Sequence, residues 1–193
     1  MIDMYEAMRA IMPHRKDDIV ITTETSIPIW EDATALEGIN VGASCMGKGS
    51  SLALGIALAN PERRVIVWDG DGGLLMNLGT LVTIADAAPK NLHHIVLDNG
   101  MYAMTGGQPV PNQGKTNFTQ LAKAAGYANA FIFDNLEDWT TGIGDILSKE
   151  GPNLILMDTV PLVTDEINRK FRPPQQPFKT FVSQIRSALV EKN

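Results

Sequence analysis

Trp68-Asp69-Gly70-Asp71-Gly72-Gly73 is the stretch of this chain that decides its fold. It follows the apolar residues 65–67, whose β-branched side chains predict a buried strand, and its glycines predict a turn at the end of that strand. A second apolar run, 95–97, is followed by Asp98-Asn99-Gly100, so the order of strand, polar residue and glycine recurs. The segment between the two runs is long enough for one crossover helix. We therefore expect two parallel strands that bring Asp71 and Asn99 to the same edge of a sheet.

Strand-like and helix-like segments alternate along the rest of the chain. This alternation predicts an α/β fold, a doubly wound parallel sheet with helices on both faces. The predicted strands are 19–22, 65–68, 92–97, 130–133 and 154–157, and the predicted helices are 5–12, 28–36, 50–60, 75–88, 118–125, 136–147 and a last one after the proline-rich residues 172–174. Residues 40–49 and 100–116 are interpreted as loops, and the second is long enough to have a function. The helix 75–88 is apolar nearly all round, so we expect it in the core or at a subunit interface.

Length and composition restrict the class of protein. The chain has 193 residues, which suits a single domain over 1–193. Its net charge of −6, without a basic stripe, argues against nucleic acid as a partner. Cys45 is the only cysteine, so there is no internal disulfide, and a reducing compartment is favoured. No apolar run could span a membrane, and the first residues are acidic where a signal peptide is basic. We expect a cytoplasmic, soluble domain that binds neither nucleic acid nor membranes.

One stretch is similar to the P-loop of nucleotide triphosphatases. The run Gly42-Ala43-Ser44-Cys45-Met46-Gly47-Lys48 has the glycine and lysine spacing of that motif. However, Gly49 stands where a Ser or Thr hydroxyl must bind Mg²⁺, and residues 37–40 do not look like the buried strand that a P-loop follows. We therefore do not interpret this chain as a nucleotide triphosphatase.

The two strand-end motifs favour a different phosphate site. Asp71 offers a carboxylate and Asn99 a carboxamide oxygen, both of which are ligands that Mg²⁺ accepts. Glycines beside Asp71 allow backbone N–H groups to approach a phosphate at the start of the following helix. Either motif alone is an ordinary turn, but both together at one sheet edge predict a site for Mg²⁺ that carries a diphosphate.

With Met46 upstream, these motifs resemble the diphosphate-binding domain of thiamine-diphosphate-dependent enzymes. The resemblance covers nearly the whole chain and is greatest to the β subunit of sulfopyruvate decarboxylase and the matching half of phosphonopyruvate decarboxylase. The stretches that carry it are 70–79, Asn99-Gly100, Gly106-Gly107-Gln108-Pro109 and, more weakly, Phe171-Arg172-Pro173-Pro174.

The resemblance implies a set of residues that hold thiamine diphosphate and Mg²⁺. Asp71, Asn99 and the backbone carbonyl of Met101 would bind the metal. Met46 would wedge beneath the cofactor, and the backbone of Ser44 and Met46 would hydrogen-bond its pyrimidine. The implied cofactor-binding residues are Thr22, Thr23, Ser44, Met46, Gly47, Gly70, Asp71, Gly72, Gly73, Asn99, Met101, Tyr102 and Ala103. Thr22 and Thr23 would offer hydroxyls to the diphosphate, although an ordinary strand end explains them equally well.

The resemblance also implies a partner. In this family the essential glutamate comes from a pyrimidine-binding domain that these 193 residues do not contain, so no catalytic residue is assigned to this chain. We expect a subunit of a thiamine-diphosphate- and Mg²⁺-dependent decarboxylase of a small 2-oxo acid, in a hetero-oligomer with at least two copies of each chain. A carboligase or acyl-CoA lyase subunit of the same superfamily, or a non-catalytic cofactor-binding subunit, is the alternative.

A few charged residues and histidines stay outside this assignment. Glu24 lies where relatives tend to have glycine, and it receives no role. Lys48, Lys115 and Arg172 are candidates for binding a second anionic group of the substrate, but each is more simply a solvated surface charge. His93 and His94 are adjacent on a predicted strand, so they point to opposite faces, and we expect structural roles for both.

Overall fold

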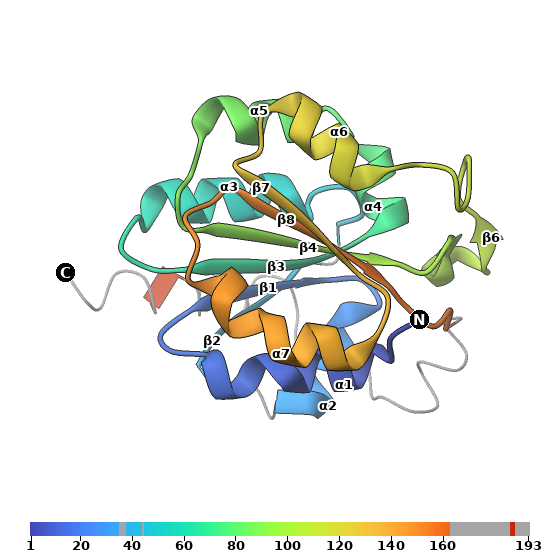
Figure 1. The fold of residues 1–193 in the computed structure, drawn as a ribbon, viewed down its shortest axis with the longest axis horizontal. Helices are drawn as coiled ribbons and strands as arrows, with labels where there is room; N and C mark the ends of the chain where they lie inside the picture. The colour runs from blue at the N-terminus through green and yellow to red at the C-terminus, as the bar shows by residue number, and fades with distance from the viewer. Residues whose placement is uncertain (35–37, 44, 163–185, 188–193) are drawn as a thin grey trace.

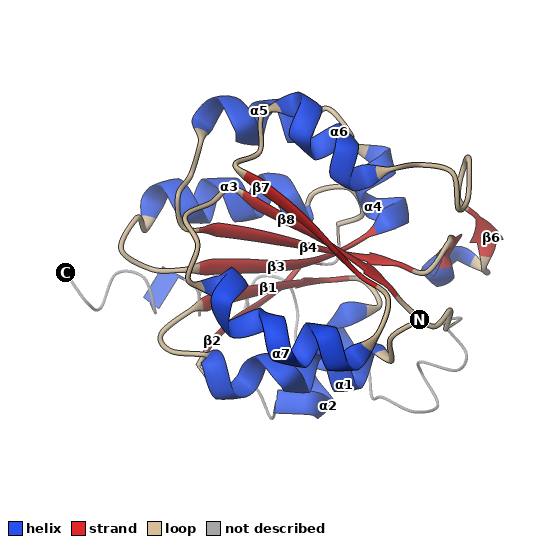
Figure 2. Cartoon of the chain, in the orientation of Figure 1, coloured by secondary structure: helices blue, strands red, loops and turns tan. Residues whose placement is uncertain are grey.

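The computed structural model describes residues 1–34, 38–43, 45–162 and 186–187. These residues form three layers, with a six-stranded sheet between two layers of helices (Figures 1 and 2). The sheet consists of β1 (Ile19–Thr23), β2 (Ile39–Ala43), β3 (Val65–Gly70), β4 (Leu92–Asp98), β7 (Asn129–Phe133) and β8 (Asn153–Asp158). Each pairing within it is parallel, which confirms the doubly wound parallel sheet.

The order of the strands indicates where on the sheet a ligand would bind. The strands lie in the order β2-β1-β3-β4-β8-β7. Strand β2 is therefore added on one side of β1, and β3 and all later strands are added on the other side. The direction of winding therefore reverses between β1 and β3. In open α/β sheets, ligands bind at such a switch point, beyond the carboxyl ends of the strands. Here those ends carry the turns that follow Thr23 and Gly70.

Helices cover both faces of the sheet. On one side lie α1 (Met4–Ile11), α2 (Ser26–Thr34) and α7 (Leu136–Leu147), and on the other α3 (Gly49–Ala59), α4 (Asp71–Met76), α5 (Thr80–Ala87) and α6 (Phe118–Ala125) (Figure 1). Short 3₁₀ turns, η1 (Met12–His14) and η2 (Ala103–Thr105), complete the set. Two helix starts use asparagine caps: Asn117 accepts a hydrogen bond from the amide of Gln120, and Asn135 accepts one from the amide of Asp138.

The core on the α1, α2 and α7 side is built around three tryptophans. Trp68 of β3 lies between Trp30 and Trp139, with ring centroids 6.1 and 6.3 Å away. All three side chains are fully buried, and the Trp139 indole N–H donates to the carbonyl of Ala7 at 2.9 Å. Buried aromatic rings contribute large apolar areas, so this cluster anchors β3, which delivers Asp69 to Gly73 to the sheet edge.

The structure corrects several sequence expectations. Residues 39–43 form strand β2, although 40–49 was expected to be a loop. The expected helix 75–88 is interrupted at Asn77–Gly79, so α4 and α5 are separate; Asn77 ends α4, and its side-chain amide donates to the Ser51 hydroxyl at 3.2 Å. The expected loop 100–116 contains an antiparallel pair of short strands, β5 (Met101–Tyr102) and β6 (Gln108–Pro109).

Other expectations concern exposure and the end of the chain. Leu58, an apolar side chain of the expected helix 50–60, is 55% exposed on α3. The proline-rich residues 172–174 lie outside the described residues, as does nearly all of the predicted last helix. Within the described residues, the structure contains no helix with the length and apolar character needed to cross a membrane.

Candidate functional site

A pocket lies at the carboxyl ends of β1, β3 and β4, at the switch point of the sheet. Its lining contains most of the residues that the sequence predicted: Thr23, Met46, Gly47, Gly70, Asp71, Gly72, Gly73, Asn99, Met101, Tyr102 and Ala103. Thr22 is not part of this lining. It is buried within β1, where it pairs in register with Gly42 and Trp68. Ser44 lies outside the described residues.

Asp71 and Asn99 meet at the sheet edge as the spacing predicted. The Asp71 side chain is only 1% exposed, and its Oδ2 accepts a hydrogen bond from the amide of Gly100 at 3.0 Å. Asn99 Oδ1 accepts one from the amide of Met101 at 3.0 Å. Asp71 therefore joins the turn after β3 to the turn after β4, while Asn99 braces its own turn, and each keeps acceptor capacity for a further ligand.

The electrostatics of this edge suit a cation. Burial raises the pKa of Asp71 to about 7, and the nearby Asp98 carboxyl adds to the rise, against hydrogen bonds from the amides of Gly72 and Gly100 that lower it. Burial also raises the pKa of Asp98, and Asp158 adds to that rise. A buried carboxylate pair is costly without a compensating positive charge. A divalent cation at Asp71 would supply that charge.

The donor set also indicates how such a cation would be held. Among the described residues, no cluster of three or more His, Cys, Asp or Glu side chains could hold a metal ion. A cation at this edge would therefore have one carboxylate, one carboxamide and backbone oxygen from this chain. The remaining positions of an octahedral Mg²⁺ would be filled by the ligand it accompanies and by water, which is how Mg²⁺ usually binds with phosphates.

Two glycines follow Asp71 at positions where the neighbouring side chains leave no room for a Cβ atom. A Cβ atom on Gly72 would lie 2.6 Å from Tyr102 Cδ1, and one on Gly73 would lie 2.8 Å from Asp69 Oδ1. Real Cβ atoms do not approach other atoms so closely, so both positions require glycine in this arrangement. Both residues belong to the first turn of α4, whose leading N–H groups have no helical acceptor. The donor set and the glycine turn therefore fit a Mg²⁺–diphosphate group.

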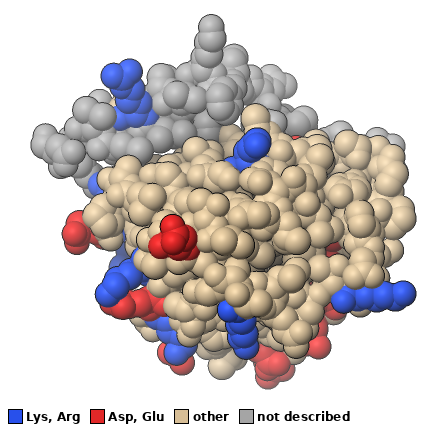
Figure 3. All heavy atoms as spheres, turned by 90° about the horizontal axis from the view of Figure 1, so that it is seen from above, with Lys and Arg blue, Asp and Glu red and all other residues tan. Residues whose placement is uncertain are grey.

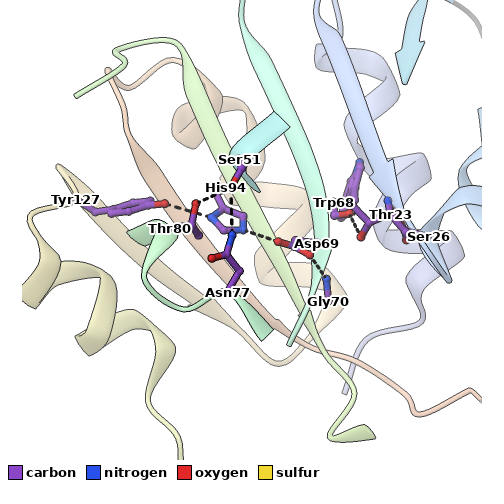
Figure 4. Close-up of polar contacts among 10 residues, drawn as sticks. All are labelled: Thr23, Ser26, Ser51, Trp68, Asp69, Gly70, Asn77, Thr80, His94 and Tyr127. Atoms are coloured by element: carbon purple, nitrogen blue, oxygen red, sulfur yellow. Dashed lines mark hydrogen bonds and ion pairs between the residues drawn. The ribbon is translucent and has the colours of Figure 1, made fainter. Parts of the chain in front are cut away.

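The turn after β1 contributes residues that the sequence analysis missed. Thr25 and Ser26 line the pocket beside Thr23. The Thr23 hydroxyl donates to the carbonyl of Trp68 at 3.0 Å, and Ser26 Oγ accepts from the Thr23 amide at 2.8 Å (Figure 4). These hydroxyls tie β1 to β3 at the switch point. The signal in the sequence was a run of Thr and Ser directly after a strand that ends at the same sheet edge.

Glu24 occupies an unusual position in the same turn. Its φ of 46° lies in the left-handed region, where residues other than Gly, Asn and Asp are rare. It lines the pocket, and its Oε1 atom is buried without a hydrogen-bond partner. Burial, followed by the charge of Asp69, raises the pKa of its carboxyl group. A strained residue with an unpaired buried acceptor is characteristic of a ligand-binding position.

The structure also changes the reasoning about the P-loop-like run. Strand β2 (Ile39–Ala43) overlaps the start of the run, so residues 39 and 40 do belong to a strand, although Ile39 and Asn40 are only half-buried. However, Gly42 is paired within β2 and does not begin a phosphate-binding turn. Gly49 starts α3 without the hydroxyl that Mg²⁺ requires in a P-loop. The interpretation against a nucleotide triphosphatase therefore rests on these two glycines.

Comparison with known protein families gives an independent result. Residues 27–157 match the family model described as "Thiamine pyrophosphate enzyme, C-terminal TPP binding domain". The chain is 40% identical over 137 residues to a phosphonopyruvate decarboxylase of Streptomyces hygroscopicus, covering 71% of this chain and 32% of that protein. It is 32% identical over 178 residues to sulfopyruvate decarboxylase subunit beta of Methanococcus maripaludis, covering 86% of this chain and 94% of that subunit.

Solved structures share the fold of this chain. A thiamine diphosphate-dependent 4-hydroxybenzoylformate decarboxylase of Rhodococcus jostii RHA1 superposes with a TM-score of 0.67 at 22% identity, over 83% of this chain and 33% of that one. This chain thus spans about a third of the phosphonopyruvate decarboxylases and of the solved enzymes that it matches. Because the family model matches well over half of its residues, the chain belongs to the C-terminal, thiamine-pyrophosphate-binding domain family of thiamine pyrophosphate enzymes.

Proposed function

We propose that this chain is the subunit of a 2-oxo acid decarboxylase that holds thiamine diphosphate and Mg²⁺, and that a second chain supplies the activating glutamate. The observation that carries the proposal is the meeting of Asp71, Asn99 and the Gly72–Gly73 turn at the switch point of the sheet. The relationship to sulfopyruvate decarboxylase subunit beta supports a separate partner, since that relative is itself named as one subunit.

In this proposal the residues of the chain bind and orient. Asp71, Asn99 and the carbonyl of Met101 would hold Mg²⁺, while the amides of Gly72 and Gly73 would face the diphosphate. Met46 would support the cofactor from the α3 side of the pocket, which it lines. When bound, thiamine diphosphate supplies the electron sink on which a 2-oxo acid loses CO₂.

The surface supports a protein partner as well. Leu58, Met76 and Val82 are 55, 57 and 61% exposed on α3, α4 and α5. In the view from above (Figure 3), charged side chains are sparse over the middle of the described surface and gather around its rim. Exposed apolar side chains on a face with little charge are typical of a subunit contact. We propose that the partner subunit packs on this side, in an assembly with at least two copies of each chain.

The charged groups that line the pocket limit the charge of the substrates that it could bind. It contains the carboxyl groups of Glu24, Asp69 and Asp71, and among the described lining residues there is no Lys or Arg. Lys48 is exposed outside the pocket, and Lys115 lines a separate cavity beside Asp98. A substrate with a second anionic group would therefore need a cation from outside this lining, either from the partner or from the part of this chain that the structure does not describe, which includes Arg172. This favours, as a second candidate, a 2-oxo acid without such a group.

The test is decarboxylation by this chain together with a chain that carries the pyrimidine-binding domain. CO₂ release is measured from pyruvate, 3-sulfopyruvate and 3-phosphonopyruvate, with thiamine diphosphate and with or without Mg²⁺. We expect release that requires both the cofactor and the metal and that is lost in Asp71→Asn. The control variant Asp145→Asn removes a carboxylate from the exposed surface of α7, on the other side of the sheet, and should retain the activity.

Two results would contradict the proposal. The first is full activity in Asp71→Asn, because the metal site would then lie elsewhere. The second is the failure of the wild-type pair to bind thiamine diphosphate in calorimetry at saturating Mg²⁺. Activity with pyruvate but not with the two dianionic substrates would select the second candidate substrate class.

A further inference from the structure

A chain of three buried polar side chains runs beneath the pocket. Asp69 Oδ2 lies 3.3 Å from His94 Nε2, and His94 Nδ1 lies 3.2 Å from the Tyr127 hydroxyl (Figure 4). The three side chains are 2, 0 and 5% exposed. They come from β3, from β4 and from the residue after the Gly126 cap of α6, so the chain crosses one face of the sheet.

The hydrogen-bond roles in this chain are consistent from end to end. With a proton on Nε2, His94 donates to Asp69 and its Nδ1 accepts from Tyr127. Burial, with a contribution from the charge of Asp69, raises the pKa of Tyr127, so its hydroxyl remains available as a donor. Every polar atom of the imidazole then has a partner, which is the condition under which a buried polar network orders its surroundings.

The other oxygen of Asp69 contacts the glycine turn that the proposed cofactor site needs. Asp69 Oδ1 accepts a hydrogen bond from the Gly70 amide at 2.9 Å. The same oxygen would lie 2.8 Å from a Cβ atom on Gly73. The carboxylate therefore sits directly under the turn that runs from Gly70 to Gly73, and Asp69 also lines the pocket.

This placement creates an electrostatic conflict that His94 resolves. A carboxylate that lines a diphosphate pocket repels the ligand if it turns toward it, because both carry negative charge. The contact with His94 fixes Oδ2 toward β4, while Oδ1 accepts from the Gly70 amide, so both oxygens are already engaged within the protein. We propose that His94 is a positioning residue, which acts through Asp69 to hold the glycine turn in its diphosphate-binding form and to keep the Asp69 charge off the diphosphate.

The inference rests on the proposed cofactor site, but one part of its test does not. In the full chain without cofactor, amide hydrogen exchange of residues 70–74 reports the order of the turn. His94→Leu removes both contacts of the imidazole, so exchange in this segment should be about tenfold faster or more. His93→Leu is the matched control, because His93 is the preceding residue of β4, is 1% exposed, and bonds to Asn153 on the opposite face.

The second measurement is the Kd for thiamine diphosphate at saturating Mg²⁺, taken by calorimetry on the chain with its partner. Loss of a residue that orients a ligand-binding group typically costs about 10- to 100-fold in affinity, and we expect this for His94→Leu. In His94→Gln the side-chain amide can still donate to Asp69 Oδ2. That variant should bind the cofactor within about threefold of wild type and should regain slow exchange, which loss of packing alone would not explain.

The outcomes separate this inference from the proposed function. If His94→Leu and His93→Leu speed the exchange of residues 70–74 equally, or if His94→Gln is no better than His94→Leu, then His94 has only a structural role and the inference is overturned. If the exchange differs as expected but wild type binds no thiamine diphosphate, the turn is positioned for another ligand. In that case the proposed function fails and the positioning role stands.

Discussion

His93 provides the most quantitative prediction from this structure. It is buried in β4, and its Nδ1 lies 3.2 Å from the side-chain amide of Asn153. Burial, followed by the positive charge of Arg64, lowers its pKa from 6.5 to about 3. Arg64 itself is held by Asp18 through contacts of 2.6 and 3.1 Å, so this charge stays in place.

The sign of the effect follows from proton binding. Between pH 6.5 and about 3, the unfolded chain binds a proton at His93 that the folded chain does not bind. The free energy of unfolding therefore falls as the pH falls below 6.5. Well above pH 6.5, His93 is neutral in both the folded and the unfolded chain, so it causes no loss of stability there. At pH 5.0, where the folded histidine is still neutral, the loss is RT ln(1 + 10^1.5), or about 2 kcal/mol.

The assay is urea denaturation of wild type and His93→Gln at pH 7.5 and pH 5.0. Glutamine can keep a hydrogen bond to Asn153 but does not titrate. The fall in the free energy of unfolding between the two pH values should be about 2 kcal/mol smaller in the variant, whatever other groups contribute to both chains. Equal falls in the two proteins would refute the reasoning, because His93 would then be able to take up a proton in the folded state.

The other predictions concern the site and one helix start. Asp71→Asn should weaken Mg²⁺-dependent binding of thiamine diphosphate at least about 10- to 100-fold, measured by calorimetry; unchanged affinity would remove Asp71 from the site. Gly72→Ala should push against the Tyr102 ring and destabilise the chain by about 1–3 kcal/mol. The double variant with Tyr102→Ala should recover most of that loss in urea denaturation, and no recovery would contradict the 2.6 Å contact. Asn117→Ala should cost about 1 kcal/mol through loss of the helix cap, which thermal denaturation would detect as a lower Tm.

The position of Asp71 and Asn99 was predictable because it depends on local signals. Each residue follows a run of β-branched side chains and stands beside glycine, and parallel strands end at a common edge. Asp98 and Asp69 were not predictable as parts of the site, since their significance depends on contacts between strands. The pKa of Asp71 is raised partly by Asp98, and Asp69 acquires its orientation from His94.

Strand β2 and the break between α4 and α5 were missed for a similar reason. The β2 residues include Gly42 and Asn40, which have low strand propensity, and they become a strand through pairing with β1. Apolar residues lie on both sides of Asn77 and Gly79, so the sequence pattern gave no sign of a break. In the structure α4 ends at Asn77, whose side-chain amide donates to the hydroxyl of Ser51 in α3. Pairing and packing between distant segments override local propensity at such points.

The sequence by itself therefore determined the α/β class, the order of its main elements and the two strand-end motifs. These features follow from hydrophobic periodicity and turn chemistry, which act over a few neighbouring residues. Only the tertiary structure decided that the two motifs line one pocket beside the switch between β1 and β3, that Thr22 is not part of its lining, and that Asp69, His94 and Tyr127 form one buried chain. Burial, charge coupling and hydrogen-bond partners belong to atoms that are distant in sequence, so they exist only once the chain has folded.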